Sequence, residues 1–338
     1  MGLAEIYRPI RSELKATETF LSKQLASSDG LLGTMTRYVA KMPGKRIRPA
    51  LALLGALLVN KSRNGSASSR RSDSLKSKAV QLAAAVEMIH TATLLHDDVI
   101  DGAELRRGFS TINAKWGDTL SVLSGDYLYS QAFCLLSGLN HPAVLNLMSD
   151  TARIVCEGEV AQIQHQYNLN LSRAEYIKII QWKTASLMGG STQAGALLAG
   201  ATEMQAQRLG SFGLNFGVAF QILDDTQDLV GDQAILGKSL GTDLTLGNMT
   251  LPFLYLRESG DPKISKRLAT WFNGNGHSPE QRTDAARFLR EYAIQQQIPS
   301  ACRREAGRYI AKARAALAPF PTSLYKSSLL ALTDFLLQ

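Results

Sequence analysis

The stretch Ala79–Gly102, AVQLAAAVEMIHTATLLHDDVIDG, decides the fold of this chain of 338 residues. It contains no proline, and its residues up to Leu95 are apolar on nearly every side. A proline inside a helix removes a hydrogen bond and clashes with the preceding turn, so the stretch predicts one long helix. A helix that is apolar all round is buried among other helices, whereas a surface helix keeps a polar face. We therefore expect this helix at the centre of a bundle.

The rest of the chain predicts helices too. None of the ten prolines occurs between Ala50 and His141 or between Ala143 and Leu251, and these stretches are rich in helix-favouring residues. No alternating strand pattern of comparable strength is present. Because 45% of the residues are hydrophobic, the chain can bury a sizeable core. We predict an all-α fold, a single-domain bundle of about ten or more helices over residues 1–338.

Two aspartate clusters follow apolar stretches. Leu94–Gly102 reads LLHDDVIDG and Ile222–Gly231 reads ILDDTQDLVG, with the first aspartates 127 positions apart. In a helix, positions i and i+4 lie on one face, so each DDxxD points two carboxylates the same way. Packed carboxylates repel one another, and Mg²⁺ relieves this because it takes oxygen ligands from carboxylates, water and phosphate. Either cluster alone also fits a solvated helix end; two copies favour a metal site between helices facing each other across a cavity.

Basic residues supply partners for anions. The segment 44–49, GKRIRP, places three cations within four residues, and further cations stand at Arg106, Arg107, Lys183 and Lys238. Arginine binds phosphate oxygens through a planar fork and lysine binds them as a point charge. Any one of these is more often a surface charge, but jointly they predict sites for two diphosphates, one held through metal and one by cations alone.

The net charge of +8 raises the question of a nucleic-acid partner. The stretch Lys61–Lys78 holds six basic residues and one acidic residue, and so contributes five of the eight excess charges. It is rich in serine and lacks aromatic residues, so it predicts a flexible solvated loop or a contact with anionic lipid or substrate, and no nucleic-acid surface. Three widely spaced cysteines without a CxxC pair, and the lack of a secretion signal or membrane span, favour the cytoplasm.

The sequence resembles the trans-isoprenyl diphosphate synthases, also called polyprenyl synthases, over essentially its whole length. The motifs are DDVIDGAELRRG at Asp97–Gly108, FQILDDTQD at Phe220–Asp228, GKSLGTDL at Gly237–Leu244, and the upstream GKRIRP, the family's homoallylic diphosphate motif. Their combination and order are highly specific. The resemblance implies the isoprenoid synthase fold with a deep central cavity, and an Mg²⁺-dependent prenyltransferase. Its substrates would be isopentenyl diphosphate and an allylic diphosphate, and it would be a homodimer.

The resemblance also implies roles for single residues. Metal ligands would be Asp97, Asp101, Asp224, Asp225 and Asp228, with Asp98 in support. The allylic diphosphate would be bound by Arg106, Lys183 and Lys238. Isopentenyl diphosphate would be bound by Lys45, Arg48, His90 and Arg107. Oxygens of Thr184 and Gln221 would face the allylic cation. The residues alone also favour a ligand role for His90, which lies two helical turns before Asp97 on the same face, while His96 reads as structural.

Product length depends on where the cavity is blocked. Ala92 and Thr93, one turn before the first aspartate, are small where short-chain members of the family often carry bulky aromatics. Phe133, Leu135 and Leu136 are candidates for a deeper floor, or equally for ordinary core. IHTATLLHDD resembles long-chain members that make octaprenyl-type quinone tails. We expect a hexaprenyl-to-nonaprenyl product, octaprenyl first, with a peripheral membrane contact when it is released.

Three other functions compete. A geranylgeranyl or farnesyl diphosphate synthase would need a floor nearer Asp97 than Ala92 and Thr93 provide. A non-catalytic regulatory subunit would have lost aspartates or the GKR lysine, which this chain keeps. A class I terpene cyclase needs no isopentenyl diphosphate site, so the GKRIRP segment counts against it. The chain departs from many long-chain members at Gly247–Pro252, GNMTLP, where it lacks a lysine, and at its non-basic end, FLLQ.

Overall fold

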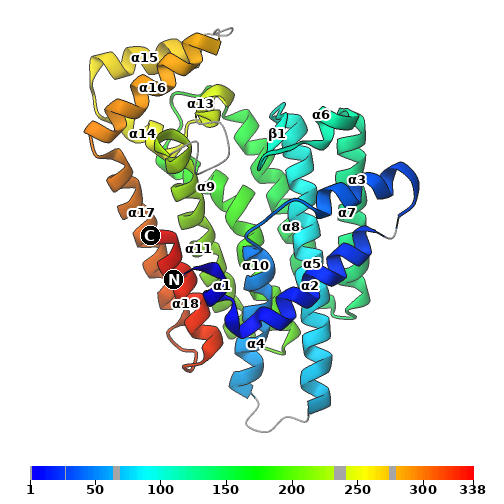
Figure 1. Ribbon diagram of the computed structural model, residues 1–338. Helices are drawn as coiled ribbons and strands as arrows, with labels where there is room; N and C mark the ends of the chain where they lie inside the picture. Colours follow the sequence, from blue (N-terminus) through cyan, green and yellow to red (C-terminus); the bar gives the residue numbers. More distant parts are fainter. Residues whose placement is uncertain (1, 27, 64–68, 232–240, 274–278) are drawn as a thin grey trace.

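The apolar stretch Ala79–Gly102 forms most of one long helix, α5 (Ser69–Ile100), in a computed structural model that describes residues 2–26, 28–63, 69–231, 241–273 and 279–338 (Figure 1). Residues Leu82 to Val86 have no exposed surface. Helices α2 (Arg11–Leu25), α4 (Ile47–Arg63), α7 (Asp118–Gly138) and α10 (Ser186–Leu198) all pack against α5. The prediction of a helix buried among other helices is confirmed.

Most of the described residues are helical, as predicted, and form more than ten helices. The strands in the described part of the chain form a single two-stranded antiparallel hairpin, β1 (Leu105–Arg106) and β2 (Phe109–Ser110). The remaining elements are α1 (Leu3–Ile6), a 3₁₀ turn (Arg8–Ile10), α3 (Gly30–Ala40), α6 (Ile112–Trp116), α8 (Pro142–Gln164), α9 (Arg173–Ile180), a π-helix (Gln181–Ala185), α11 (Glu203–Val230), α13 (Thr242–Leu246), α14 (Leu251–Glu258), α15 (Pro262–Asn273), α16 (Pro279–Gln295), α17 (Ile298–Leu317) and α18 (Leu324–Leu337).

Helix α10 joins the two helices that carry the aspartates. It packs against α5, α4 and α11, whereas α5 and α11 share few direct contacts. Two glycines permit this close packing: a Cβ on Gly195 would lie 2.1 Å from the Ala52 carbonyl oxygen, and one on Gly213 would lie 2.4 Å from that of Met188. Helix α10 thus contacts both helices that carry the aspartates.

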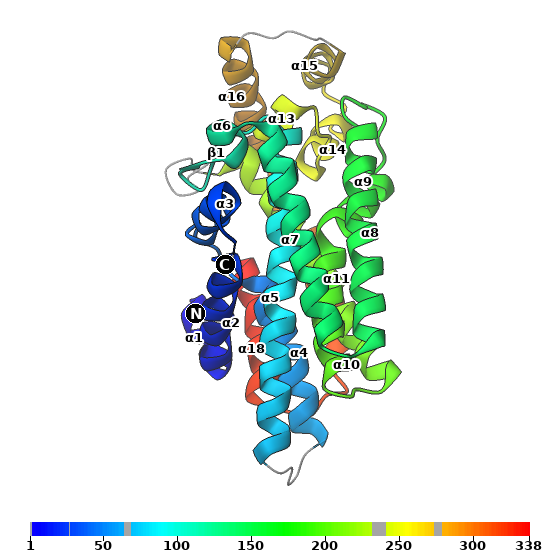
Figure 2. The same cartoon turned by 90° about the vertical axis from the view of Figure 1, so that its right-hand side faces the viewer.

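Both aspartate clusters lie at the same end of the bundle. Asp97 stands near the C-terminal end of α5 and Asp224 near that of α11. The elements that follow these helices, β1 and α6 after α5 and α13 after α11, lie together at the top of two views turned by 90° (Figures 1 and 2). Because α5 and α11 both end at this end of the bundle, aspartates that are 127 positions apart in the sequence lie at the same end of the molecule.

Most of the segment Lys61–Lys78, which was predicted as a loop, is helical. Helix α4 runs to Arg63 and α5 begins at Ser69, and residues 64–68 of this segment lie outside the described residues. Tertiary contacts hold the start of α5: the Lys76 ammonium lies 3.3 Å from the buried Glu13 carboxylate of α2. The high serine content suggested a loop, but packing against α2 stabilises a helix there.

None of the helices in the described part of the chain is long and apolar enough to cross a membrane. All three cysteines are free thiols.

Candidate active site

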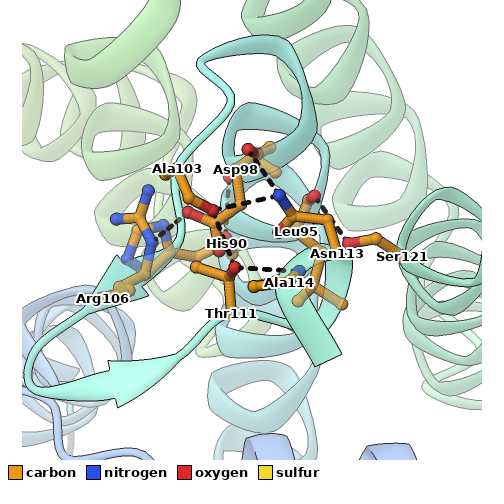
Figure 3. Close-up of polar contacts among 10 residues, drawn as sticks. His90, Leu95, Asp98, Ala103, Arg106, Thr111, Asn113, Ala114 and Ser121 are labelled. Atoms are coloured by element: carbon orange, nitrogen blue, oxygen red, sulfur yellow. Dashed lines mark hydrogen bonds and ion pairs between the residues drawn. The ribbon is translucent and has the colours of Figure 1, made fainter. Parts of the chain in front are cut away.

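The first aspartate cluster lies at the C-terminal end of α5 and is hydrogen-bonded to the hairpin that follows it. Asp98 is buried, and its carboxylate accepts a hydrogen bond of 2.6 Å from Nε of Arg106 on β1 (Figure 3). The Ala103 carbonyl oxygen accepts hydrogen bonds from the Thr111 hydroxyl at 2.7 Å and from the Asn113 amide at 3.0 Å. These contacts fix the turn after α5. Arg106, which the resemblance assigned to the allylic diphosphate, therefore also holds Asp98 in place.

Asp97 and Asp101 lie in a poorly solvated environment. Burial raises the pKa of Asp97 to about 7; the Lys183 ammonium lowers it, and the Glu159 and Asp101 carboxylates raise it again. Burial also raises the pKa of Asp101, with Lys183 again the charge that acts most strongly on it. Carboxylates that are desolvated and close to other acids favour a bound cation. This is the environment that the DDxxD spacing predicted.

In the second cluster, two of the three aspartates accept hydrogen bonds from other protein groups. Both oxygens of the buried Asp225 accept hydrogen bonds, one from the Tyr176 hydroxyl at 2.6 Å and one from the Gln221 amide at 2.7 Å. Asp228 accepts the Asp243 backbone N–H at 3.0 Å, so it anchors the chain where α13 begins. Asp225 and Asp228, predicted as metal ligands, are thus hydrogen-bonded within the protein. Asp225 parallels Asp98, the second aspartate of the first cluster.

Cations gather beside His90, which lies on α5 two helical turns before Asp97. Nη1 of Arg48 lies 3.1 Å from Nε2 of His90, so the structure joins two residues predicted for one site. Burial lowers the pKa of His90 well below its usual value, and the charges of Arg48 and Arg107 lower it further. The pKa of Arg48 is lowered to about 10 by burial. A neutral histidine among partly buried guanidinium groups is a site that favours an anion.

The GKRIRP segment is shaped by contacts that the sequence did not predict. Arg46 has a left-handed backbone with φ of 50°, and its Nη1 donates to the buried Glu87 carboxylate at 2.7 Å. The Tyr7 hydroxyl donates to the Lys45 carbonyl oxygen at 3.0 Å. These bonds hold the backbone, while the Lys45 side chain is exposed. Glu87 lies one helical turn before His90 in the sequence, and this spacing could have predicted that Glu87 lies near the same group of residues.

Lys183 and Thr184 lie in the π-helix, a local widening that often marks functional sites. Nζ of Lys183 lies 2.5 Å from Oε2 of Glu159 on α8. A Cβ on Gly158 would lie only 2.3 Å from the Lys183 backbone nitrogen, so glycine permits the contact between α8 and the π-helix. Sequence reasoning missed Glu159. The remaining predicted residue, Lys238, falls outside the described residues.

Helices α5 and α7 run antiparallel along their whole length. The Ser121 hydroxyl donates to the Leu95 carbonyl oxygen at 3.1 Å near one end, and the Lys78 ammonium donates to that of Leu139 at 3.3 Å near the other. The later part of α7 therefore lies beside the beginning of α5, far from the aspartates.

The five predicted chain-length residues lie on these two helices. Ala92 and Leu136 are fully buried, and Thr93, Phe133 and Leu135 are half-buried. From the antiparallel pairing, Phe133 and Leu136 lie about 20 Å below Asp97 along the helix axis, at 1.5 Å per residue. That these side chains line a deep cavity stays a prediction.

The donor set fits a divalent metal bound together with diphosphate. No three His, Cys, Asp or Glu side chains within the described ranges lie close enough to hold a metal ion alone. Mg²⁺ commonly takes one or two carboxylates, with water and substrate phosphate completing its shell. Asp97, Asp101 and Asp224 would supply such carboxylates from two helices.

Fold and site together define an isoprenoid synthase. The structure aligns with that of a polyprenyl synthase from Caulobacter crescentus CB15, complexed with calcium and isoprenyl diphosphate, with a TM-score of 0.90, 33% identity and coverage of 99% of this chain and 97% of that one. Residues 29–289 match the model of the polyprenyl synthetase family. The chain belongs to this family and is a polyprenyl diphosphate synthase, a prenyltransferase, as the resemblance implied.

Two curated relatives are similar over most of their length. The octaprenyl diphosphate synthase of Escherichia coli (strain K12) is 35% identical over 277 residues, which is 82% of each chain. Component 2 of the heptaprenyl diphosphate synthase of Geobacillus stearothermophilus is 40% identical over 255 residues, 75% of this chain and 76% of that one.

Proposed function

We propose that this chain condenses isopentenyl diphosphate with an allylic diphosphate to make a long-chain all-trans polyprenyl diphosphate, in the hexaprenyl-to-nonaprenyl range and octaprenyl first. The observation that carries the proposal is that two unlike groups of charged residues lie at one end of the bundle. One consists of Arg48, His90 and neighbouring cations, and the other of carboxylates with Lys183. They are close enough that the Asp224 charge raises the pKa of Arg107, which burial lowers.

Each site suits one substrate. Lys45, Arg48, His90 and Arg107 would bind isopentenyl diphosphate directly, because guanidinium and ammonium groups neutralise phosphate without metal. Asp97, Asp101 and Asp224 would bind the allylic diphosphate through Mg²⁺, with Lys183 and Lys238 contacting phosphate oxygens. A divalent metal, when bound, neutralises the diphosphate and improves it as a leaving group.

The reaction then follows from how the residues hold the substrates. The C–O bond of the allylic diphosphate breaks, and diphosphate leaves with the electron pair of that bond. Oxygens of Thr184 and Gln221 would stabilise the allylic cation as fixed dipoles. The double bond of isopentenyl diphosphate, held nearby, forms the new C–C bond. A proton passes from the adjacent carbon to the released diphosphate, which restores an alkene that is again allylic.

Chain length follows from the depth below Asp97. Ala92 and Thr93 are small, so α5 itself places no bulky side chain at these two positions. The candidates for a floor, Phe133 and Leu136, lie about 20 Å below Asp97. A straight octaprenyl chain is longer than this depth, so it would have to bend or to extend past Phe133 and Leu136. The proposed range is supported instead by the small side chains of Ala92 and Thr93 and by the names of the similar relatives, octaprenyl and heptaprenyl synthases.

We further propose a homodimer through α7 and α8. These helices pack against each other, and both expose large apolar side chains: Val122 and Leu123 on α7, and Val160 and Ile163 on α8. Exposed apolar groups of this kind are typical of protein interfaces. Light scattering after size-exclusion chromatography should give twice the mass of 36.8 kDa, and Leu123→Glu should reduce it. Cytoplasmic localisation and a membrane contact during product release stay predictions.

A product assay tests the proposed function. The protein is incubated with Mg²⁺, farnesyl diphosphate and isopentenyl diphosphate, and the dephosphorylated products are sized by chromatography. A ladder that ends near octaprenyl is the expected result. Arrest at geranylgeranyl would contradict the long-chain assignment. The lack of product with any primer would favour a non-catalytic subunit.

A further inference from the structure

Glu159 forms an ion pair with Lys183, whose charge acts on both Asp97 and Asp101 of the first cluster. Its Oε2 lies 2.5 Å from Nζ of Lys183, and both side chains are mostly buried, 14% and 19% exposed. The pair joins α8 to the π-helix at the contact that Gly158 permits. The packing of the two helix backbones therefore sets the position of the Glu159–Lys183 pair.

Lys183 stands among three carboxylates. Asp97, Glu159 and Asp101 all raise its pKa against the effect of burial, which lowers it. An ammonium on a flexible four-carbon stem moves toward the strongest negative charge within its reach. Without Glu159, that charge would be the pair of Asp97 and Asp101, the same carboxylates proposed to bind the metal.

The hydrogen bonds of the pair leave capacity for a ligand. Lysine has three N–H donors, and one is directed at Glu159, which leaves two for other acceptors. The other oxygen of Glu159, Oε1, is buried without a hydrogen-bond partner. A buried polar atom without a partner costs stability, so the arrangement is better explained by a role in binding than by stability of the fold.

We propose that Glu159 is a positioning residue that holds the Lys183 ammonium beside Asp97 and Asp101, so that metal binds the carboxylates while Lys183 binds the diphosphate. The inference rests on the proposed roles of Lys183 and the aspartates. It predicts that loss of Glu159 turns Lys183 into a competitor of the metal.

The test is a double-mutant cycle with Glu159→Gln and Lys183→Met. Glu159→Gln should raise the Mg²⁺ concentration for half-maximal activity about tenfold, the usual size of effect for residues that orient metal ligands. The KM for the allylic diphosphate should rise, and that for isopentenyl diphosphate should stay unchanged. In the Lys183→Met protein, Glu159→Gln should have no further effect, because the residue acts through Lys183. Glu159→Asp should restore part of the Mg²⁺ response.

A binding measurement accompanies the kinetics. The rise in Tm on adding Mg²⁺ and inorganic diphosphate should be smaller for Glu159→Gln than for wild type, since stabilisation follows occupancy. Glu157→Gln is the matched control, because this exposed residue lies two positions earlier on α8 and pairs only with nearby surface groups such as Arg153. It should change neither readout.

Three outcomes would overturn the inference. An unchanged Mg²⁺ dependence in Glu159→Gln would contradict the proposed role of Glu159 directly. An equal rise in the Mg²⁺ requirement in the Lys183→Met background would show that Glu159 contacts the metal directly. A folding defect in Glu159→Gln that Lys183→Met does not repair would make the pair a stability element. If Lys183→Met itself leaves the allylic KM unchanged, the proposed role of Lys183 fails instead, which separates the two claims.

Discussion

Gly158→Ala tests whether the contact between α8 and the π-helix sets the active site. A Cβ at residue 158 would lie 2.3 Å from the Lys183 backbone nitrogen and 2.7 Å from both Lys183 Cα and the Trp182 carbonyl carbon. An ordinary contact begins at 3.4 Å, so the two backbones must separate by about 1.1 Å. All three neighbours are backbone atoms, and no flexible side chain can move aside to absorb the strain.

The expected loss of activity is much larger than the loss of stability. A displacement of about 1 Å in a substrate-positioning group can cost about a hundredfold in rate, so kcat/KM for the allylic diphosphate should fall by that order. Overpacking costs about 1–3 kcal/mol, and the better helix propensity of alanine returns about 1 kcal/mol. The free energy of unfolding should therefore fall by only about 0–2 kcal/mol.

Steady-state condensation assays with farnesyl and isopentenyl diphosphates, together with urea denaturation, measure both quantities. Gly307→Ala on α17 is the matched control, because a Cβ there meets no atom within 4 Å. That variant should keep full activity and gain about 0.5–1 kcal/mol of stability. The reasoning is refuted if Gly158→Ala stays within about threefold of the wild-type kcat/KM, well short of the hundredfold loss expected from a 1 Å displacement.

Three further outcomes are expected. Ala92→Phe should shorten the product ladder made from farnesyl diphosphate, and an unshortened ladder from folded protein would show that this position does not limit the chain. Tyr176→Phe should lower the free energy of unfolding by about 1–3 kcal/mol in urea denaturation, because it removes a donor from the buried Asp225 carboxylate; an unchanged midpoint would show that the bond contributes nothing. Burial raises the pKa of the Cys302 thiol to about 12, so at pH 8 iodoacetamide should modify this cysteine only after unfolding, as read by peptide mass spectrometry; rapid labelling of the native protein would contradict its burial.

Much of the fold and part of the site follow from local sequence. The period of the helix places Asp97 and Asp101 on one face, and His90 two turns before them, whatever the neighbouring helices do. The same local argument predicts a buried α5, because a stretch that is apolar all round is unstable in water. The sequence also predicts that Arg48 and His90 belong to one site, and their side chains lie in contact.

Contacts between helices were not predictable in this way. The start of α5 at Ser69 contradicts its loop-like composition, because packing against α2 and α7 outweighs weak helix propensity. Asp98 and Asp225 look equivalent to their neighbouring aspartates in sequence, yet Arg106 and Tyr176 bind them within the protein.

The sequence by itself therefore determined the helical class, the spacing of the carboxylates along each helix and the kind of chemistry. Only the tertiary structure decided which carboxylates are bound within the protein, and that Glu159 meets Lys183. The physical reason is one of range. Helical periodicity depends on residues within one or two turns. The partner of a buried charge depends instead on how closely two backbones approach. Gly158 permits the close approach of α8 to the backbone of Lys183, and this approach brings Glu159 to Lys183.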